Sequence, residues 1–344
     1  MEKDFLLLID GSSLLSTQYF GNLPNSIKYA KTKEERAAHF NEILHTSTGI
    51  YTNGVYGFIK SLLKIIKEQD PSHIAVAWDI TRDTFRRRIS EDYKANRDES
   101  DKPLIEQYKT CQNLLEKIGI KQFYCSEYEA DDYCGSLAKK FENQVPIRIV
   151  SKDRDYFQLV NDNTRLWLIT NTKKKMEELC KKHKVKQTLQ DKLFELTPEL
   201  IEAEYGYSPE VVPMLKGLMG DASDNIKGIP GIGEKTAIIL ANEFKTMDNL
   251  YNKINNLSEN ELKDLKVEWK KTLGLNRCPL PYLLAKSEDG VLKGEEAGRL
   301  SEKLSTIFKD IDLSDTTLDM LKLYLDSDII KKELNKLEIT SIKF

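Results

Sequence analysis

Nine acidic residues lie where a buried metal site would need them. They are Asp10, Asp79, Glu129, Asp131, Asp132, Asp153, Asp155, Asp221 and Asp224. Most of them follow an apolar run rich in β-forming residues, which places them at the end of an expected strand. A carboxylate in such a place costs free energy unless a cation accompanies it. The pattern therefore predicts a carboxylate cluster that binds divalent metal.

Each acid taken alone has a simpler interpretation. Asp10 could be an ordinary helix cap or turn residue, and Glu129, Asp131 and Asp132 could favour the positive end of the helix that follows them. That alternative is weaker for the whole set, because acidic residues recur at three expected strand ends and at one helix start. Residues two apart do not share a helix face. Glu129 and Asp131 therefore reach one site only if Glu129 lies at or before the helix cap.

The expected elements would bring these acids together. Short apolar runs predict strands at 5–9, 73–78, 147–150 and 166–169, and apolar residues at helical spacing predict helices at 55–69 and 103–118. Such alternation is typical of a parallel sheet covered by helices on both faces. Ligands of these sheets bind beyond the carboxyl ends of the strands. We therefore expect Asp10, Asp79 and Asp153 to converge on one edge.

Length and composition restrict the class of protein. The 344 residues are enough for one large domain and a smaller one. There is no apolar run near 18 residues and no secretory leader at the N-terminus, so neither a membrane span nor export is expected. The five cysteines form no ligand pattern and the four histidines are dispersed, which indicates a cytoplasmic protein with reduced thiols. A metal held by oxygen ligands is expected to be Mg²⁺ or Mn²⁺.

The distribution of charge matters more than the net charge of −3. Residues 82–97 carry six basic and three acidic side chains, a sum of +3, and residues 171–192 carry eight lysines and three acids, a sum of +5. Basic segments beside a metal site suit a phosphodiester substrate. A solvated helix face is the alternative for the lysine run. In the first segment Phe85 and Tyr93 are interleaved with the charges, and such rings can stack on bases.

The chain changes character near residue 220. The spacing from Gly228 to Gly233 superficially suggests a P-loop, but Glu234 intrudes before Lys235 and no strand precedes the motif. A helical hairpin is the better interpretation. Gly231 and Gly233 permit a tight turn, and the N–H groups that begin the next helix can face a phosphate. A plain structural turn is the alternative.

Seven motifs together resemble the 5′-nuclease superfamily, and most of all the 5′→3′ exonuclease domain of bacterial DNA polymerase I. They are LLLIDGSSLL (6–15), TNGVYGF (52–58), VAWD (76–79), FRRRISEDYKANR (85–97), EADD (129–132), SKDRDYFQLV (151–160) and GDASDNIKGIPGIGEKTA (220–237). The resemblance implies a Rossmann-like, PIN-type sheet domain over residues 1–205, with an arch segment at about 82–110. It also implies a helical domain over 206–344 that contains a helix-three-turn-helix motif.

The resemblance implies a two-metal phosphodiesterase that acts on branched DNA. By motif, one ion would be held by Asp10, Asp79, Glu129 and Asp131, and the other by Asp131, Asp153, Asp155 and Asp221, with Asp132 and Asp224 in support. Two such ions can activate a water and stabilise the leaving oxygen.

The resemblance also implies the residues that contact DNA. Lys94 and Arg97 match residues that steer the scissile phosphate, and Arg86 lies in the same arch, through or under which a single-stranded 5′ end passes. Tyr93 belongs to this segment. The duplex backbone would be gripped, often with a bound K⁺ ion, by the helix-three-turn-helix residues Gly228, Gly231, Ile232, Gly233, Lys235 and Thr236.

The implied substrate is DNA with a 5′ flap, a nick or a single-stranded 5′ end, and an RNA primer in a hybrid is a further possibility. The sequence ends near the limit of the nuclease domain, so we expect a stand-alone monomer that works with a polymerase in trans. The sequence departs from the family at Lys152, where a glycine is usual, and its segments 171–195 and 255–295 are longer.

Two other functions are compatible with the fold. A non-catalytic protein that binds DNA junctions is one, but the intact carboxylates speak against it because binding alone does not require a repulsive acidic cluster. A PIN-type ribonuclease is the other. The glycine turn at 228–237 speaks against a ribonuclease, because a small enzyme of that class does not need a clamp for duplex DNA.

Overall fold

Six strands form the central sheet of the protein. The computed structural model describes residues 4–187, 189, 192–275 and 277–342. The strand order is β3-β2-β1-β4-β5-β6. The first five strands are parallel and the last is antiparallel: β1 (Leu6–Asp10), β2 (His73–Ala77), β3 (Gln122–Phe123), β4 (Ile147–Ser151), β5 (Thr164–Ile169) and β6 (Leu193–Leu196). The mostly parallel sheet is confirmed. The short strands β3 and β6 were not predicted.

The register of the central strands places their ends at one level. Ile9 of β1 pairs with Val76 of β2 on one side and with Val150 of β4 on the other. The chain segments that leave these three strands therefore begin at the same edge of the sheet. This is the physical basis for expecting Asp10, Asp79 and Asp153 near one another.

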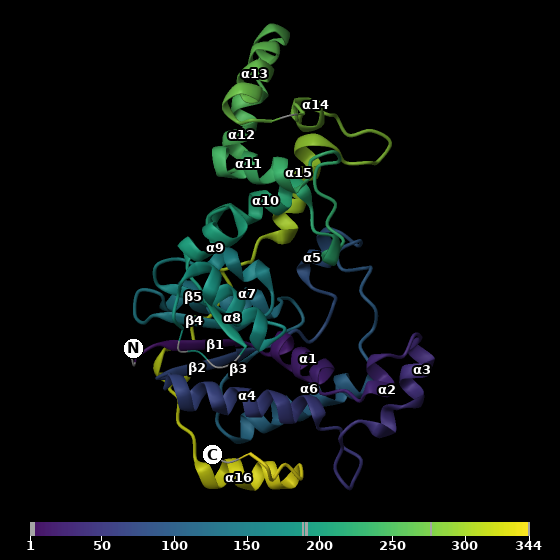
Figure 1. The fold of residues 1–344 in the computed structure, drawn as a ribbon, viewed down its shortest axis with the longest axis vertical. Coiled ribbons are helices and arrows are strands. Elements are labelled where there is room, and N and C mark those ends of the chain that lie inside the picture. Colours follow the sequence, from purple (N-terminus) through teal and green to yellow (C-terminus); the bar gives the residue numbers. More distant parts are fainter. Residues whose placement is uncertain (1–3, 188, 190–191, 276, 343–344) are drawn as a thin grey trace.

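Both faces of the sheet are covered by helices, as predicted (Figure 1). Along β1, Leu7 and Ile9 enter one core while Leu6 and Leu8 enter the other, because side chains alternate across a strand. The first core also contains residues of α1 (Gly11–Gly21), α4 (Asn53–Gln69) and α6 (Lys102–Lys117). The second contains residues of α7 (Ala130–Phe141), α8 (Lys173–His183) and α9 (Pro198–Tyr205).

The predicted helices at 55–69 and 103–118 correspond to α4 and α6. The helix α4 ends where Asp70 takes a left-handed conformation (φ 51°) and Pro71 follows, since a proline disfavours helix in the residue before it. Pro103 lies in the first turn of α6, where its missing N–H removes no hydrogen bond.

Short helices complete this part of the chain. They are α2 (Asn25–Lys28), α3 (Lys33–Ala38) and α5 (Phe85–Ile89), together with the 3₁₀ turns η1 (Phe40–Glu42), η2 (Arg154–Leu159), η3 (Pro209–Val211), η4 (Ala222–Asp224) and η5 (Asp319–Leu321). No helix in the described part of the chain is long and apolar enough to cross a membrane.

A third hydrophobic core lies away from the sheet and is purely helical (Figure 1). Its helices are α10 (Val212–Met219), α11 (Glu234–Phe244), α12 (Met247–Ile254), α13 (Glu259–Thr272) and α14 (Leu280–Leu283). Helix α15 (Gly294–Ser305) packs against α10. Helices α10 and α15 pack closely where they cross at Gly217 and Gly298. A Cβ on Gly217 would lie 3.0 Å from the carbonyl oxygen of Gly298, which is tighter than an ordinary contact. The glycines permit this approach.

The chain beyond α15 returns to the sheet, which differs from a helical domain over 206–344. Ile307 enters the core beneath α7, and the Leu323 N–H donates to the carbonyl of Ser72 at 2.8 Å. Helix α16 (Ser327–Lys336) buries Ile330 and Leu334 in the core that contains α4 and α6 (Figure 1). Burial of this apolar face favours the return. The boundary at 205/206 stays a prediction.

Candidate active site

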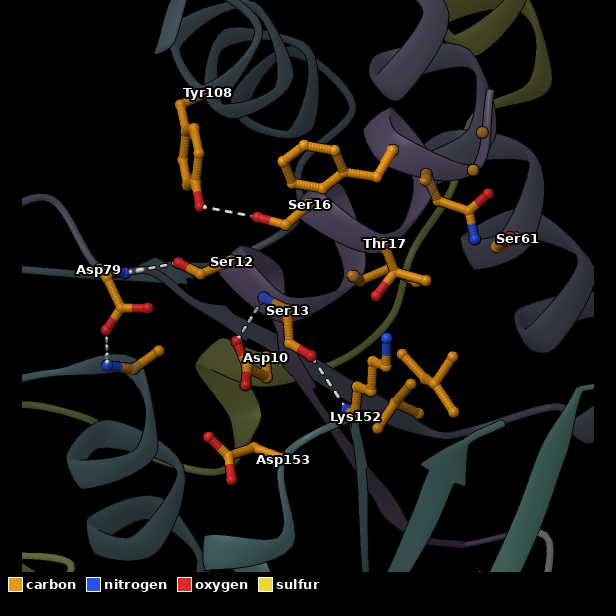
Figure 2. Close-up of a pocket in the computed structure, with 18 of the residues that line it drawn as sticks. Asp10, Ser12, Ser13, Ser16, Thr17, Ser61, Asp79, Tyr108, Lys152 and Asp153 are labelled. Atoms are coloured by element: carbon orange, nitrogen blue, oxygen red, sulfur yellow. Dashed lines mark hydrogen bonds between the residues drawn. The ribbon is translucent and has the colours of Figure 1, made fainter. Parts of the chain in front are cut away.

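Carboxylates that follow three neighbouring strands line one large cleft, as the strand pattern predicts (Figure 2). Asp10 ends β1 and caps α1, accepting from Ser13 N–H at 2.9 Å and from Ser151 Oγ at 2.8 Å. Asp79 accepts from the backbone N–H that begins α7, at 2.8 Å. With Asp153, these residues line a cleft of about 1730 Å³.

The start of α7 brings further acids to the same cleft. Glu129 is the N-cap of the helix and forms a reciprocal capping box with Asp132, so it occupies the cap position that a shared site with Asp131 requires. Glu129 accepts from Lys94 Nζ at 2.6 Å and from the Tyr93 hydroxyl at 3.0 Å. Burial alone would raise the pKa of Glu129, but the charge of Lys94 holds it below its ordinary value.

Three carboxyl groups of this cleft have raised pKa values. Burial, with the nearby Asp79 charge, raises the pKa of Asp10 to about 7. Burial is also the main cause that raises the pKa of Asp79, and burial with the charge of Asp132 raises that of Asp131. These groups do not all ionise readily unless more positive charge enters the cleft.

A second hollow of about 480 Å³ adjoins the first and is lined by three further acids of the predicted set. Asp153 lines both, and Asp155, Asp221 and Asp224 line only the second. Lys216 of α10 lies among them and donates to Asp155 and, at 2.7 Å, to Asp221. Sequence reasoning missed Lys216, although a lysine inside the apolar run VPMLKGLM was a usable signal.

The pKa values of the two carboxyl groups that pair with Lys216 are shifted in opposite directions. Burial and the charge of Asp153 raise the pKa of Asp155 to about 7, despite the ion pair. Burial would also raise the pKa of Asp221, but Lys216 and Ser223 lower it to about 2. Asp155 therefore still requires positive charge, whereas Asp221 is already compensated.

The residues fit a divalent metal by their chemistry. Among the residues that the structure describes, no three acidic, histidine or cysteine side chains are already arranged around one point as ligands. Lysine and arginine side chains hold several carboxylates instead, including Lys94 at Glu129 and Lys216 at Asp221. The atoms that could bind a metal are carboxylate oxygens, and together these groups would carry more negative charge than the nearby lysines and arginines neutralise. Hard cations such as Mg²⁺ or Mn²⁺ prefer ligands of this kind.

Arg86 requires a correction, because its burial conflicts with the predicted catalytic contact. Its side chain is 1% exposed and pairs with both carboxylate oxygens of Asp132, at 2.7 and 2.6 Å. Its remaining donors bind the carbonyls of Leu304 and Thr306, at 3.0 and 2.9 Å. Asp132, itself fully buried, also accepts from the N–H groups of Glu129 and Phe308, at 3.0 and 2.8 Å, so it supports the site rather than facing a metal.

The two aromatic residues of this segment also differ from the prediction. Tyr93 is 4% exposed and its hydroxyl is bound to Glu129, so its ring is not available to stack on a base. Phe85 packs against Tyr128 and Phe308, with ring centroids 5.9 and 6.0 Å apart. Both rings contribute buried surface that anchors the basic segment to the rest of the protein.

Lys94 and Arg97 line the large cleft. Their role at the scissile phosphate stays a prediction. Lys94 has a left-handed backbone (φ 53°), and its N–H donates to the Asp224 carbonyl at 2.9 Å. Arg97 pairs with the Asp224 carboxylate while its side chain stays 44% exposed. Asp224 therefore positions two cations at the cleft, which agrees with a supporting role.

The glycine turn presents one face to solvent. Gly231 has φ 95°, and a Cβ there would overlap the Tyr282 ring, so only glycine fits without rearrangement. Gly233 is the N-cap of α11 and has open space around it. Lys235 is exposed and Thr236 is half-buried in the first turn of that helix. This arrangement can offer N–H groups to a phosphate.

Two predicted DNA-binding residues of this turn are buried, and this is a second correction. The Gly228 N–H donates to Ser301 Oγ at 3.0 Å, and Ile232 is 6% exposed in the helical core. The hydrogen bond of Gly228 fixes one end of the turn to α15, and the burial of Ile232 fixes the other end to the helical core. Neither can touch a DNA backbone directly.

Within the segment 171–195, residues 173–183 form α8, in which only Leu179 is buried. The lysines at 173–175 and at 181 and 182 are exposed, which agrees with a solvated helix face. The second long segment, 255–295, supplies α13 and α14 at the far end of the helical part (Figure 1).

Comparisons with known protein families cover most of the chain. Residues 5–190 match the family described as "5'-3' exonuclease, N-terminal resolvase-like domain". Residues 207–326 match the one described as "5'-3' exonuclease, C-terminal SAM fold".

Two relatives illustrate the similarity. A 5′-3′ exonuclease of Halalkalibacterium halodurans is 34% identical over 334 residues, which cover 96% of this chain and 92% of that protein. DNA polymerase I of Bacillus caldotenax is 34% identical over 316 residues, which cover 90% of this chain but 31% of that protein. The chain thus spans about a third of the length of this polymerase relative.

The fold is also that of solved nucleases. A bacteriophage T5 flap endonuclease, solved as a complex with DNA and metal ions, aligns with a TM-score of 0.56 and 16% identity over 97% of this chain and 99% of that one. Human GEN1 in complex with Holliday junction DNA aligns with a TM-score of 0.51 and 11% identity, over 97% of this chain and 68% of that one. At these identities the likeness concerns the fold alone.

Proposed function

Because the chain belongs to the 5′-3′ exonuclease family, we propose that it is a metal-dependent 5′→3′ exonuclease and 5′-flap endonuclease that hydrolyses DNA phosphodiesters. One observation carries the proposal. A single cleft combines under-compensated carboxylates at the ends of parallel strands with two basic side chains, Lys94 and Arg97. Such a cleft suits metal-assisted cleavage of a phosphodiester and explains the cost of burying so many acids.

We assign the metal ligands by position in this cleft and in the hollow beside it. One Mg²⁺ or Mn²⁺ ion would be held by Asp10, Asp79, Glu129 and Asp131, and a second by Asp131, Asp153, Asp155 and Asp221. Asp153 lines both spaces, which supports a shared centre. When bound, the ions would activate a water molecule and stabilise the leaving oxygen.

The protein's own residues prepare this chemistry. Ser13 and Ser151 orient the Asp10 carboxylate through hydrogen bonds. Lys94 is bound to Glu129 in the large cleft, and Lys216 is bound to Asp221 in the smaller hollow. Each lysine could bind a phosphate oxygen instead if its carboxylate partner became a metal ligand. Arg97 remains partly exposed at the rim and would hold the neighbouring phosphate.

The substrate follows from the same arrangement. The exposed part of the glycine turn, with Gly231, Gly233 and Lys235, would bind the duplex backbone, and a K⁺ ion at this turn is part of the proposal. The substrate would be DNA with a 5′ flap, a nick or a single-stranded 5′ end, including an RNA primer in a hybrid. The protein would act as a cytoplasmic monomer in primer and flap removal during replication and repair, with a polymerase in trans.

The test is cleavage of an internally labelled 5′-flap duplex with Mg²⁺, with Mn²⁺ or with EDTA. Single strand, blunt duplex and RNA serve as comparison substrates. Metal-dependent cutting at the flap junction is the expected result. Binding without cutting in every metal would favour a non-catalytic junction-binding protein, and cutting of RNA alone would favour a ribonuclease.

A further inference from the structure

The large cleft carries opposite charge at its two ends. Near the strand ends it is lined by the carboxylates of the proposed metal site. It then continues along α1, α4 and α6 and past the ends of β4 and β5, where its lining includes five lysines: Lys60, Lys64, Lys109, Lys152 and Lys192. Among the described lining residues of α4, α6 and the 169–171 and 192–193 segments there is no acidic side chain. We call this part the lysine extension.

Three of these lysines have no carboxylate partner among the residues that the structure describes. Lys109, Lys152 and Lys192 are exposed, and no described carboxylate lies within ion-pair distance of them. They differ in this from Lys94 and Lys216, which are bound to acids at the metal end. Unpaired ammonium groups that line a concave surface attract an anionic ligand with little competition from the protein itself.

Hydroxyl groups and one aromatic ring complete the lining. Ser13, Thr17 and Ser61 line the same part of the cleft, and the Lys152 side chain points toward Thr17 and Ser61 and away from Asp153 (Figure 2). Phe20 lines the cleft and is 48% exposed, an unusual state for a large apolar side chain. Grooves that bind single-stranded nucleic acid combine cations that contact the phosphates with aromatic rings on which the bases stack.

The position of the extension decides which part of the substrate it would meet. The hollow on the Asp155 side is also lined by Glu234, the first residue of α11 next to the glycine turn. The lysine extension runs along α4 and α6, across the sheet from the helical part that carries α11 (Figure 1). Of its lysines, only Lys152 also lines the hollow on the Asp155 side. A strand that enters from duplex held at the glycine turn and crosses the carboxylates would therefore continue into the lysine extension.

We propose that the lysine extension binds the phosphates of the single-stranded 5′ segment beyond the cleavage site, without regard to sequence. This inference rests on the proposed nuclease function and adds the path of the displaced strand. Lys152 is central to it, because the residue lies immediately before Asp153 and joins the metal end to the extension.

The experiment compares two DNA substrates and two matched double variants. The test variant carries Lys109→Ala and Lys192→Ala, two lysines that line the large cleft and not the hollow on the Asp155 side. The control carries Lys331→Ala and Lys332→Ala, which remove the same charge from exposed positions of α16, outside the cleft. Dissociation constants are measured in EDTA on a nicked duplex and on the same duplex with a single-stranded 5′ flap, over a range of salt concentrations. Cleavage is then measured with Mg²⁺.

The test variant should bind the flapped duplex about 3- to 10-fold more weakly than the wild type while binding the nicked duplex equally well. Its salt dependence on the flapped duplex should fall by about 0.7 for each phosphate that a lysine no longer neutralises. The control should match the wild type on both substrates.

Two results would overturn the inference. Equal weakening on the two substrates would place the lysines on duplex DNA, and unchanged binding would leave the extension without a nucleic-acid ligand. A wild-type protein that binds but never cuts refutes the nuclease function, and the binding comparison is still decided separately.

Discussion

The guanidinium of Arg86 and the carboxylate of Asp132 form a two-point ion pair in a position almost sealed from solvent, with N–O distances of 2.7 and 2.6 Å. The pair joins the start of the basic segment to the first turn of α7. The same Asp132 carboxylate accepts from the N–H of Glu129, at 3.0 Å. A buried structural pair is thus connected directly to a proposed metal ligand.

Loss of one partner of this pair should destabilise the protein strongly. Arg86→Met leaves the Asp132 charge buried without compensation, which typically costs about 3–5 kcal/mol. Arg88→Met is the matched control, because Arg88 pairs with Glu127 on the surface with 51% of its side chain exposed; it should cost less than about 1 kcal/mol. Urea unfolding monitored by circular dichroism measures both. Similar costs for the two variants would show that the buried pair is not special.

Asp131→Asn should abolish cleavage and spare DNA binding. The substitution keeps the shape of the side chain but removes the charge that we assign to both ions. Single-turnover cleavage of the flap substrate in Mg²⁺ and its dissociation constant in EDTA provide the two measurements. A variant that cuts at nearly the wild-type rate would refute the assignment of Asp131.

Lys94→Ala should slow cleavage far more than it weakens binding to duplex. A positioned donor at a reacting oxygen is typically worth about 10²- to 10³-fold in rate, whereas one peripheral phosphate contact changes affinity much less. Lys235→Ala, an exposed lysine at the start of α11, provides the comparison and should act mainly on affinity. If the Lys94 variant lost rate and affinity equally, Lys94 would be only a general phosphate contact.

The metal-free protein should lose stability as the pH rises. The pKa of Asp10 and that of Asp155 are about 7 in the folded protein, against an ordinary value of 3.8. Between these values the folded state holds more protons than the unfolded state, so the free energy of unfolding falls as pH increases. Without metal, Tm should be lower at about pH 8 than at about pH 5.5.

Added Mg²⁺ tests the same groups. It should raise Tm more at about pH 8, where these carboxyls are ionised and the ion does not compete with protons. Asp10→Asn should reduce both the pH dependence and the gain from Mg²⁺. Thermal unfolding with and without the metal at the two pH values measures this. An equal Mg²⁺ effect at both pH values would contradict the expectation.

The glycine turn offers a contrast between two neighbouring glycines. Gly231→Ala places a Cβ against the Tyr282 ring at a backbone φ of 95° and should cost about 2–4 kcal/mol. Gly233→Ala meets open space at φ −95° and should change stability by less than about 0.5 kcal/mol. Chemical unfolding compares them directly. A Gly231→Ala protein as stable as the wild type would show that the turn rearranges easily.

The sequence alone was sufficient for four of the six strands and for the acids that follow three of them. Strand and helix periods are local properties, and β1, β2, β4 and β5 are found within one to two residues of their predicted bounds. Parallel strands end at one edge, so Asp10, Asp79 and Asp153 had to converge there. Helix geometry set only a condition for Glu129, that it lie at or before the helix cap if it shares a site with Asp131, and Glu129 is the N-cap of α7.

Only the tertiary structure decided which basic and aromatic residues face the cleft. Arg86 meets carbonyl groups 218 and 220 positions away in the chain, and no local pattern distinguishes such a buried arginine from one that contacts substrate. The pairing of Lys216 and the arrangement of Lys109, Lys152 and Lys192 along the cleft likewise depend on segments far apart in sequence. Local periodicity fixes which elements form, whereas the partner of a long charged side chain is fixed only when those elements pack.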